Sequence, residues 1–356
     1  MFKVLKINLI TLFVLLLILE IFGRIYLSYR DSSNYFQSFK VRELTKYTPI
    51  GLTQYDDSLG YIMSEGFDGV VTTAQKHWNN KQVRILKDGV RSNDNLERYD
   101  SDILAVGDSF TFGDQVSNSE TWPSCLERKT KRGVLNAGIP GYGGAQSVKR
   151  AKLLSEKYSF NELIVSFYIE DFSRDQNIFN NGFPTPAVIK DKNGKIGWAQ
   201  VPSKNTIGSR YQPESDDNFL QFFLSLFYEN SVLGRPIIID FLNLDKDLSG
   251  IYLTKRHNNA VFTEEVIRFA IQELSKINIP KKTILIQYAS NYDNPHKFEY
   301  LRNPIKKFAR KFDIPVLDSY EELSMMKFKK EEIWNSHHTK LGNELICKYI
   351  YKNIKN

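Results

Sequence analysis

The sequence has little cysteine and no cysteine motif. Its 356 residues contain two cysteines, Cys125 and Cys347, and neither falls in a CxxC or metal-type spacing. Both lie in segments with the pattern of a buried helix face, where free cysteines are commonly found. We therefore expect two unbonded thiols. A bridge between them is the less favoured alternative, open if the chain is exported.

The sequence also lacks repeats, low-complexity tracts and a strong charge excess. Residues 1–30 hold four basic residues and one acidic residue, so +3 of the total +7 is confined there and +4 is left for the other 326 residues. That excess is too weak to indicate a nucleic-acid surface. A content of 42% hydrophobic and 13% aromatic residues can fill a sizeable core, which excludes a disordered or fibrous chain.

No small-residue cleavage site follows the apolar N-terminal run. After Lys3 and Lys6 comes "INLITLFVLLLILEIFGRIYL", in which Glu20 and Arg24 stand four apart and can pair on a helix. A cleavable signal peptide ends in residues of A-x-A type, and none occur here. The pattern predicts an uncleaved single-pass anchor over 1–30, with the remainder of the chain on the extracytoplasmic side. A cleaved signal is the alternative.

What the rest of the chain contains is an alternation typical of α/β proteins. Short apolar runs at 103–106, 134–135, 163–168, 283–288 and 314–317 are separated by amphipathic stretches such as "TWPSCLERKTKR" and "NPIKKFARKF". Continuous apolar runs followed by helices are typical of parallel strands covered on both faces. We predict a doubly wound α/β domain, a three-layer α/β/α sandwich with a central parallel sheet.

Two segments fall outside that alternation. Residues 31–100 predict short strands broken by glycine turns, which we expect to form a connecting segment packed on the main domain at 101–356. Residues 175–257 form an insertion, with a hairpin turning at Asn193-Gly194 and one or two apolar helices over 218–242. The insertion could cover the site as a lid, or could serve only as extra packing or a membrane-surface contact.

A serine stands where the first parallel strand ends. In "ILAVGDSFTFG", four apolar residues run into Gly107, Asp108 and Ser109. Sites in open parallel sheets form at the carboxyl ends of the strands, where "NAGIPGYGG" and "IEDFSRD" also follow their strands. Far along the chain, "NSHHTKLGNEL" places His337 and His338 just before a helix. A base reaching Ser109 from that loop would make the serine a nucleophile.

These motifs carry a family resemblance. "AVGDSFTFG", "VLNAGIPGYGGAQ" and "NSHHTKLGNELI" resemble the first, second and last blocks of the SGNH/GDSL hydrolases. "VRSND", "ETWPSCLE" and the N-terminal anchor resemble the membrane-anchored bacterial members. The resemblance covers most of residues 85–172 and 280–350, and implies the flavodoxin-like form of the three-layer fold.

The resemblance implies a role for each matched residue. Ser109 would be the nucleophile and its own amide one oxyanion donor, and the amide of Gly141 another. The spacing to Gly342 matches the catalytic base to His337, with His338 as runner-up. No metal and no diffusible cofactor is implied.

Two positions depart from the family pattern. Glu170 replaces an asparagine that donates to the oxyanion, whereas an ionised carboxylate only accepts hydrogen bonds. Burial could keep Glu170 protonated, or Gln146 could donate instead. Asn335 replaces the aspartate that orients the histidine, a change that can cost about 10⁴-fold in a serine triad. Asn335 could still orient it, or Glu331 or Glu332 could reach in.

The expected function follows from this set of residues. It is a serine-dependent ester hydrolase or O-acyltransferase of the cell envelope, acting on acylated glycans or lipids through an acyl-serine, with the membrane but no nucleic acid as a partner. The alternative is a catalytically impaired glycan-binding or assembly protein, in which Trp198 and Tyr211 could stack on sugar rings.

Overall fold

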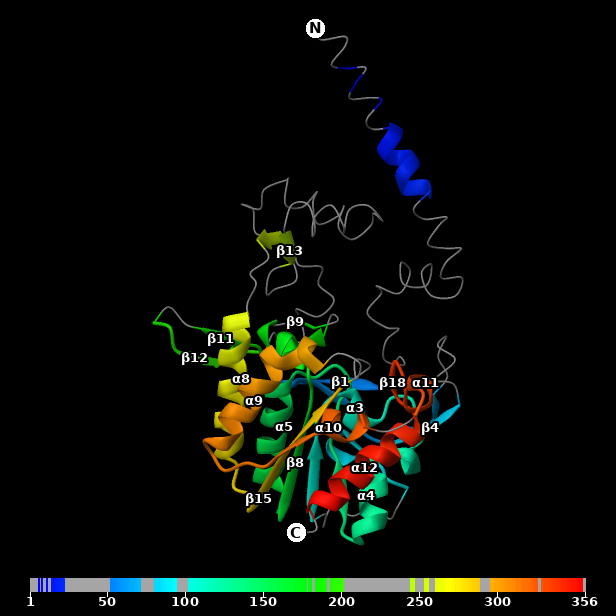
Figure 1. Ribbon diagram of the computed structural model, residues 1–356, viewed down its shortest axis with the longest axis vertical. Coiled ribbons are helices and arrows are strands. Elements are labelled where there is room, and N and C mark those ends of the chain that lie inside the picture. Colours follow the sequence, from blue (N-terminus) through cyan, green and yellow to red (C-terminus); the bar gives the residue numbers. More distant parts are fainter. Residues whose placement is uncertain are drawn as a thin grey trace. The chain divides into compact units, whose positions relative to one another are not determined.

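The structure is a computed structural model, and the chain divides into two units (Figure 1). The described residues are 6, 8, 11, 14–22, 52–71, 80–94, 102–177, 179–180, 183–190, 193–201, 244–246, 253–255, 260–288, 295–325 and 328–354. One unit takes residues 1–47 and 208–258, and the other takes 48–207 and 259–356. The candidate site belongs entirely to the second unit.

In the first unit, the described residues are helical at 14–22 and form a hairpin of β13 (Leu244–Lys246) and β14 (Leu253–Lys255). Within the described part of the chain, no helix combines the length and the apolar character that a membrane crossing requires. Most of the anchor expected over 1–30, and the apolar helices expected over 218–242, lie outside the described residues.

The second unit is built on an eight-stranded sheet of order β16-β15-β8-β6-β7-β5-β4-β3. The strands are β3 (Asp68–Val71), β4 (Lys81–Leu86), β5 (Val90–Arg91), β6 (Ile103–Val106), β7 (Val134–Asn136), β8 (Glu162–Tyr168), β15 (Lys281–Gln287) and β16 (Val316–Asp318). β16, β15, β8, β6 and β7 pair in parallel, in the 2-1-3-4-5 order of flavodoxin-like sheets. The α/β class and the parallel centre predicted from the sequence are present.

Strands from the 31–100 segment extend this sheet. β5, β4 and β3 join the edge beside β7 by antiparallel pairing, with Arg91 opposite Asn136. The short strands expected there are present, and the sheet they enlarge is mixed rather than wholly parallel. A second hairpin, β1 (Thr53–Asp56) and β2 (Gly60–Met63), is followed in the chain by β3.

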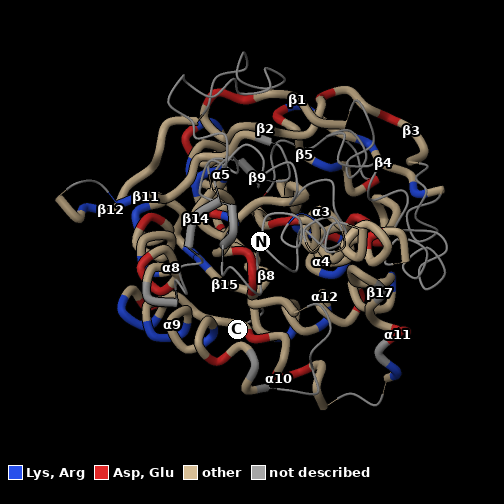
Figure 2. The backbone as a smooth tube through the Cα atoms, turned by 90° about the horizontal axis from the view of Figure 1, so that it is seen from above, with Lys and Arg blue, Asp and Glu red and all other residues tan. Residues whose placement is uncertain are grey.

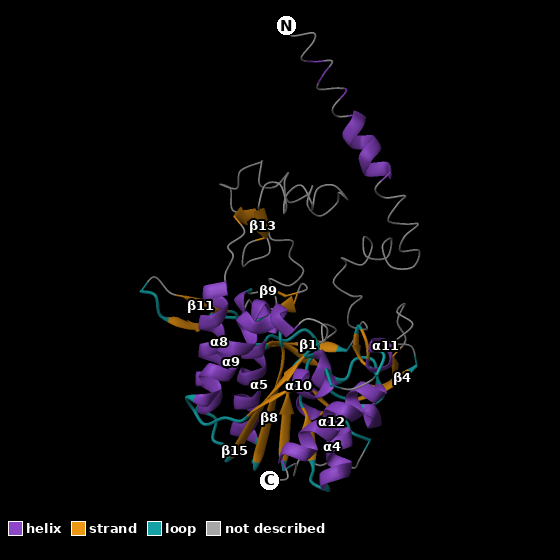
Figure 3. Ribbon diagram, in the orientation of Figure 1, coloured by secondary structure: helices purple, strands orange, loops and turns teal. Residues whose placement is uncertain are grey.

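Helices cover both faces of the sheet (Figures 1 and 3). Strand side chains alternate between faces, so Leu104 and Val106 join one apolar cluster while Ile103 and Ala105 join the other. All four are fully buried, as a two-sided sheet requires. Seen from above, α8 and α9 lie on one side of β8 and β15, and α4 and α12 on the other (Figure 2). The covering helices are α4 (Trp122–Thr130), α5 (Gly144–Lys157), α8 (Ala260–Ser275), α9 (Glu299–Arg310) and α12 (Lys340–Ile354).

Shorter elements fill the connections. Before the insertion they are η2 (Lys87–Gly89), α3 (Ser109–Phe112), η3 (Asn118–Glu120) and η4 (Asp171–Gln176). Within it they are β9 (Phe179–Asn180), β10 (Phe183–Pro184), β11 (Val188–Lys190) and β12 (Ile196–Trp198). Toward the C-terminus they are η7 (Pro295–Phe298), α10 (Ser319–Leu323), α11 (Lys330–Ile333), β17 (Trp334–Asn335) and β18 (His337–His338). The hairpin predicted at Asn193-Gly194 is the β11–β12 pair, whose turn has Gly194 at φ +79°.

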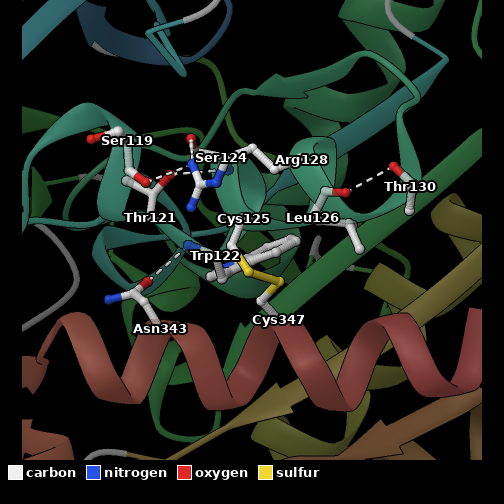
Figure 4. The surroundings of a disulfide bond; sticks show 10 residues. All are labelled: Ser119, Thr121, Trp122, Ser124, Cys125, Leu126, Arg128, Thr130, Asn343 and Cys347. Carbon is white, nitrogen blue, oxygen red and sulfur yellow. Dashed lines mark hydrogen bonds between the residues drawn. A yellow bond between two sulfur atoms is a disulfide. The ribbon is translucent and has the colours of Figure 1, made fainter.

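The expectation of two free thiols is wrong, because Cys125 and Cys347 form a disulfide (Figure 4). Both side chains are buried, as the helix pattern predicted, but α4 and α12 face one another across the second apolar cluster. Beside the bridge, the backbone N–H of Trp122 donates to Asn343 Oδ1 at 3.0 Å. The sequence pattern gave the buried faces but not the pairing of two helices more than 200 residues apart.

Candidate active site

Ser109 is held by a tight turn at the end of β6. Asp108 caps α3 by accepting the N–H of Phe110 at 3.0 Å, and the four-residue helix ends at Gly113 with φ +88°. Gly107 has no room for a side chain, since a Cβ there would meet Thr111 Oγ1 at 2.3 Å. β6 and β8 are the neighbouring strands at which the chain order reverses, where open α/β sheets bind their ligands.

His337 lies against Ser109, with Nε2 2.8 Å from Oγ. The β17–β18 hairpin carries it, and its bend has Ser336 in the left-handed region at φ +68°. The backbone N–H of His337 donates to Gln115 Oε1 at 3.3 Å, which ties the hairpin to the serine loop. Burial lowers the pKa of His337 to about 3, with His338 and Arg174 acting in the same direction. The imidazole is therefore neutral near pH 7 and able to accept the serine proton.

His338, the alternative base, is placed differently. It is 3% exposed, and its ring packs edge-on against Phe110 with centroids 4.9 Å apart. Burial lowers its pKa to about 4. The structure therefore brings His337 rather than His338 to the serine hydroxyl.

A carboxyl group that the sequence pattern did not single out also faces His337. Asp114 Oδ2 lies 3.8 Å from His337 Nε2, and the Asp114 side chain is 5% exposed. Burial and the nearby charge of Asp108 raise the pKa of Asp114, against the opposing effect of Arg91 and Arg174. The only sequence signal was its position, directly after the glycine that ends the serine turn.

Further carboxyl groups lie beneath the serine. Ser109 Oγ donates to Asp108 Oδ2 at 3.1 Å, so this oxygen is a second acceptor for the hydroxyl proton besides His337. Arg174 pairs with Asp171 and lies 3.8 Å from Asp108. Both carboxyl groups are buried, and desolvation raises the pKa of each. One arginine thus serves two buried acids, a clustering typical of functional sites.

Glu170 occupies the position of the expected amide donor but does not behave as proposed from the sequence. Its side chain is exposed, so the burial that was to keep it protonated is absent. Its Oε2 accepts the hydroxyl of Tyr168 at 2.7 Å, and Tyr168 stacks on Phe110. Gln146 is no substitute, because its amide nitrogen donates to Leu59 O at 2.8 Å. Both of those suggestions are corrected.

The remaining predicted residues divide in the same way. Gly141 lies in the loop after β7 with φ +82°, a conformation that favours glycine; its role as a donor stays a prediction. The backbone of Asn335 forms β17, and its side chain lies outside the described part. Glu332 accepts the N–H of Lys329 at 2.7 Å and caps its own turn, while Glu331 is exposed. The suggestion that either glutamate supports His337 is therefore not met.

The aromatic residues proposed to stack on sugars lie away from Ser109 or beyond description. Trp198 packs edge-on against Phe269 of α8 at 5.2 Å and is half-buried. Tyr211 lies outside the described residues. In the described part of the chain, no group of three or more His, Cys, Asp or Glu side chains could hold a metal ion.

No family model matches the sequence, and no curated protein matches it. Among solved structures, the chain is similar to the psychrotrophic esterase EstA from Pseudoalteromonas sp., at 14% identity over 71% of this chain and 96% of that one, with a TM-score of 0.40. It is similar to a lipase/acylhydrolase from Enterococcus faecalis at 16% identity over 71% and 95%, TM-score 0.37. The acetylxylan esterase Axe2 from Geobacillus stearothermophilus gives 12% over 71% and 94%, TM-score 0.37. These likenesses are distant, and the function proposed below rests on the site itself.

Proposed function

We propose that the chain is a serine-dependent ester hydrolase or O-acyltransferase that acts through an acyl-serine. The single observation that carries this proposal is the 2.8 Å contact between Ser109 Oγ and His337 Nε2 at the switch point of the sheet. A neutral imidazole at hydrogen-bond distance from a serine is the arrangement that general-base activation of a nucleophile requires.

The geometry supports a two-step reaction. Ser109 Oγ attacks the acyl carbon while its proton passes to His337 Nε2, and the carbonyl electron pair moves onto oxygen. The amides of Ser109 and Gly141 are the proposed donors to that oxyanion. Collapse breaks the bond to the alcohol, which takes the proton from Nε2. The acyl-serine then gives its acyl group to water or to another alcohol, by the same steps in reverse order.

The substrate class and location remain part of the proposal. An acylated carbohydrate or lipid of the cell envelope is supported by the basic and apolar N-terminus, and the disulfide is of a kind that forms in oxidising compartments. Hydrolysis and transfer differ only in the acceptor. Incubation with a labelled acetyl donor would distinguish them by whether label appears in free acetate or on a glycan.

A non-catalytic role is the second candidate, and the exposed carboxylate of Glu170 favours it. Where the resemblance implies an amide donor, a negative charge would oppose an oxyanion, and losing one donor costs about 10²- to 10³-fold in rate. Such a chain would bind acylated glycans without cleaving them.

The two candidates separate in one assay on short acyl esters. The catalytic proposal expects turnover by the full-length protein in detergent and its loss in Ser109→Ala. A folded wild type without turnover, or a Ser109→Ala variant with full turnover, would contradict it. Glycan binding by an inactive wild type would then support the second candidate.

A further inference from the structure

We infer that Asp114 is the carboxylate partner of His337, and that it stabilises the imidazolium formed when Ser109 gives up its proton. This inference rests on the proposed esterase chemistry. It assigns to a buried residue of the serine loop the support for the histidine that Asn335, as a neutral amide, cannot supply as charge.

The backbone places Asp114 between the two reacting residues. Its N–H donates to the carbonyl of Ser109 at 3.3 Å, so it is tied to the nucleophile itself. The next residue, Gln115, accepts the backbone N–H of His337 at 3.3 Å. Residues 114–115 therefore bridge the serine turn to the histidine hairpin, and they hold Asp114 Oδ2 3.8 Å from His337 Nε2.

Arg91 fixes this bridge from beneath. It is 1% exposed and donates to the carbonyls of Phe112 at 2.8 Å, Gly113 at 2.6 Å and Val116 at 2.6 Å. These carbonyls lie on both sides of Asp114 in the loop. The guanidinium is thus committed to the backbone and does not form an ion pair with the Asp114 carboxyl.

The Asp114 side chain has no structural bond that would explain its burial. Its Oδ1 is buried without a hydrogen-bond partner among the described residues. A buried unsatisfied carboxyl oxygen is costly and therefore calls for a functional explanation. By contrast, Asp175, which is equally buried, accepts the N–H groups of Ala145 at 2.8 Å and Gln146 at 3.0 Å and caps α5.

The contact at Nε2 acts through charge. When Nε2 receives the Ser109 proton, a positive charge appears 3.8 Å from Asp114 Oδ2, inside a site with little solvent. The proton then goes on to the leaving alcohol, and Asp114 neither takes nor gives one. The carboxylate form is therefore the active form of Asp114.

This predicts a rise in activity with pH. Burial and Asp108 raise the pKa of Asp114, so the active carboxylate is lost as pH falls through that raised value. His337 does not produce this limb, because its pKa is lowered to about 3. The charged and titratable groups around Asp114 are Arg91 of β5, Tyr61 of β2, Asp108 before α3, Arg174 of η4 and His337 of β18.

The test compares two buried aspartates in the full-length protein. We would measure kcat and KM for a short acyl ester from about pH 5 to pH 9 in wild type, Asp114→Asn, Asp114→Glu and Asp175→Asn. We expect Asp114→Asn to lower kcat by about 10²-fold with little change in KM, and to abolish the rise with pH. Asp114→Glu should restore the rise in part, and Asp175→Asn should keep it.

Two results would overturn the inference. One is a folded Asp114→Asn protein with the kcat and pH profile of wild type. The other is loss of the pH limb in Asp175→Asn, which would assign it to the carboxyl that caps α5. Ser109→Ala in the same assay separates the two levels of the argument. Activity that survives in Ser109→Ala refutes the esterase proposal, whereas an inactive Ser109→Ala beside a normal Asp114→Asn refutes only the role of Asp114.

Discussion

The two loops that meet at the candidate site are held in different ways. The nucleophile loop, residues 107–118, is fixed by bonds along its own stretch and by the many donors of Arg91. The histidine loop, residues 334–339, is a short hairpin that relies on Gln115 and on α12, which is tied to α4. The nucleophile is thus built locally, whereas the position of the base depends on contacts more than 200 residues apart in sequence.

The largest effect should come from removing the base itself. We expect His337→Ala to reduce kcat/KM for a short acyl ester by about 10²- to 10⁴-fold, because no other described imidazole contacts Ser109. His338→Gln is the matched control, and it should keep most of the activity. Equal losses in both variants would mean that the histidine loop is disturbed as a whole.

Breaking the nucleophile loop should show mainly as lost stability. Arg91→Met leaves several buried carbonyls without a donor, and we expect the free energy of unfolding to fall by about 3–5 kcal/mol. Arg91→Lys should recover little, since an ammonium cannot reproduce the spread of guanidinium donors. Urea unfolding of the three proteins measures this, and an unchanged midpoint in Arg91→Met would argue against the local construction of this loop.

Opening the disulfide tests the long-range support of the histidine loop. Replacing Cys125 and Cys347 together by alanine should lower the free energy of unfolding by about 2–4 kcal/mol. The bond between Asn343 and Trp122 remains, so the folded variant should keep part of its activity. Reduction of wild type by a thiol is the matched comparison. Full activity and unchanged stability in the variant would show that the base does not depend on this bridge.

The smallest effect concerns a carboxyl group away from both loops. Burial raises the pKa of Asp175 to about 7, against the lowering effect of its bonds from the start of α5. Folding therefore favours the protonated form, and the stability that this proton supplies is lost as pH rises from about 4, the ordinary pKa of the side chain, to about 7.

The buried histidines titrate with the opposite sign over an overlapping range. Their pKa values of about 3 and 4 lie below the ordinary value, so their contribution is lost as pH falls below about 6.5. Subtracting the urea midpoints of Asp175→Asn from those of wild type removes the histidine contribution. The difference should change between pH 5 and pH 8 in the direction of relatively weaker wild type at pH 8, and a flat difference would contradict the assignment.

The contrast between the loops also explains what sequence reasoning could predict. Gly107, Asp108 and Ser109 form a turn whose chemistry is written in adjacent residues, and the apolar runs that flank it predicted the parallel strands. Asp114 was missed because its meaning depends on His337, which arrives from the far end of the chain. The disulfide was missed for the same reason, since only packing brings α4 and α12 together. Glu170 was assigned a burial that depends on how η4 leaves β8, which no local pattern specifies.

The central claim is that His337 activates Ser109, and covalent labelling tests it most directly. A fluorophosphonate reacts when an activated serine oxygen attacks phosphorus and fluoride leaves. We would treat full-length wild type, Ser109→Ala and His337→Ala in detergent and quantify the labelled protein. The account predicts strong labelling of wild type, none of Ser109→Ala and little of His337→Ala. Labelling of the folded His337→Ala protein at the wild-type rate, or none in folded wild type, would contradict it.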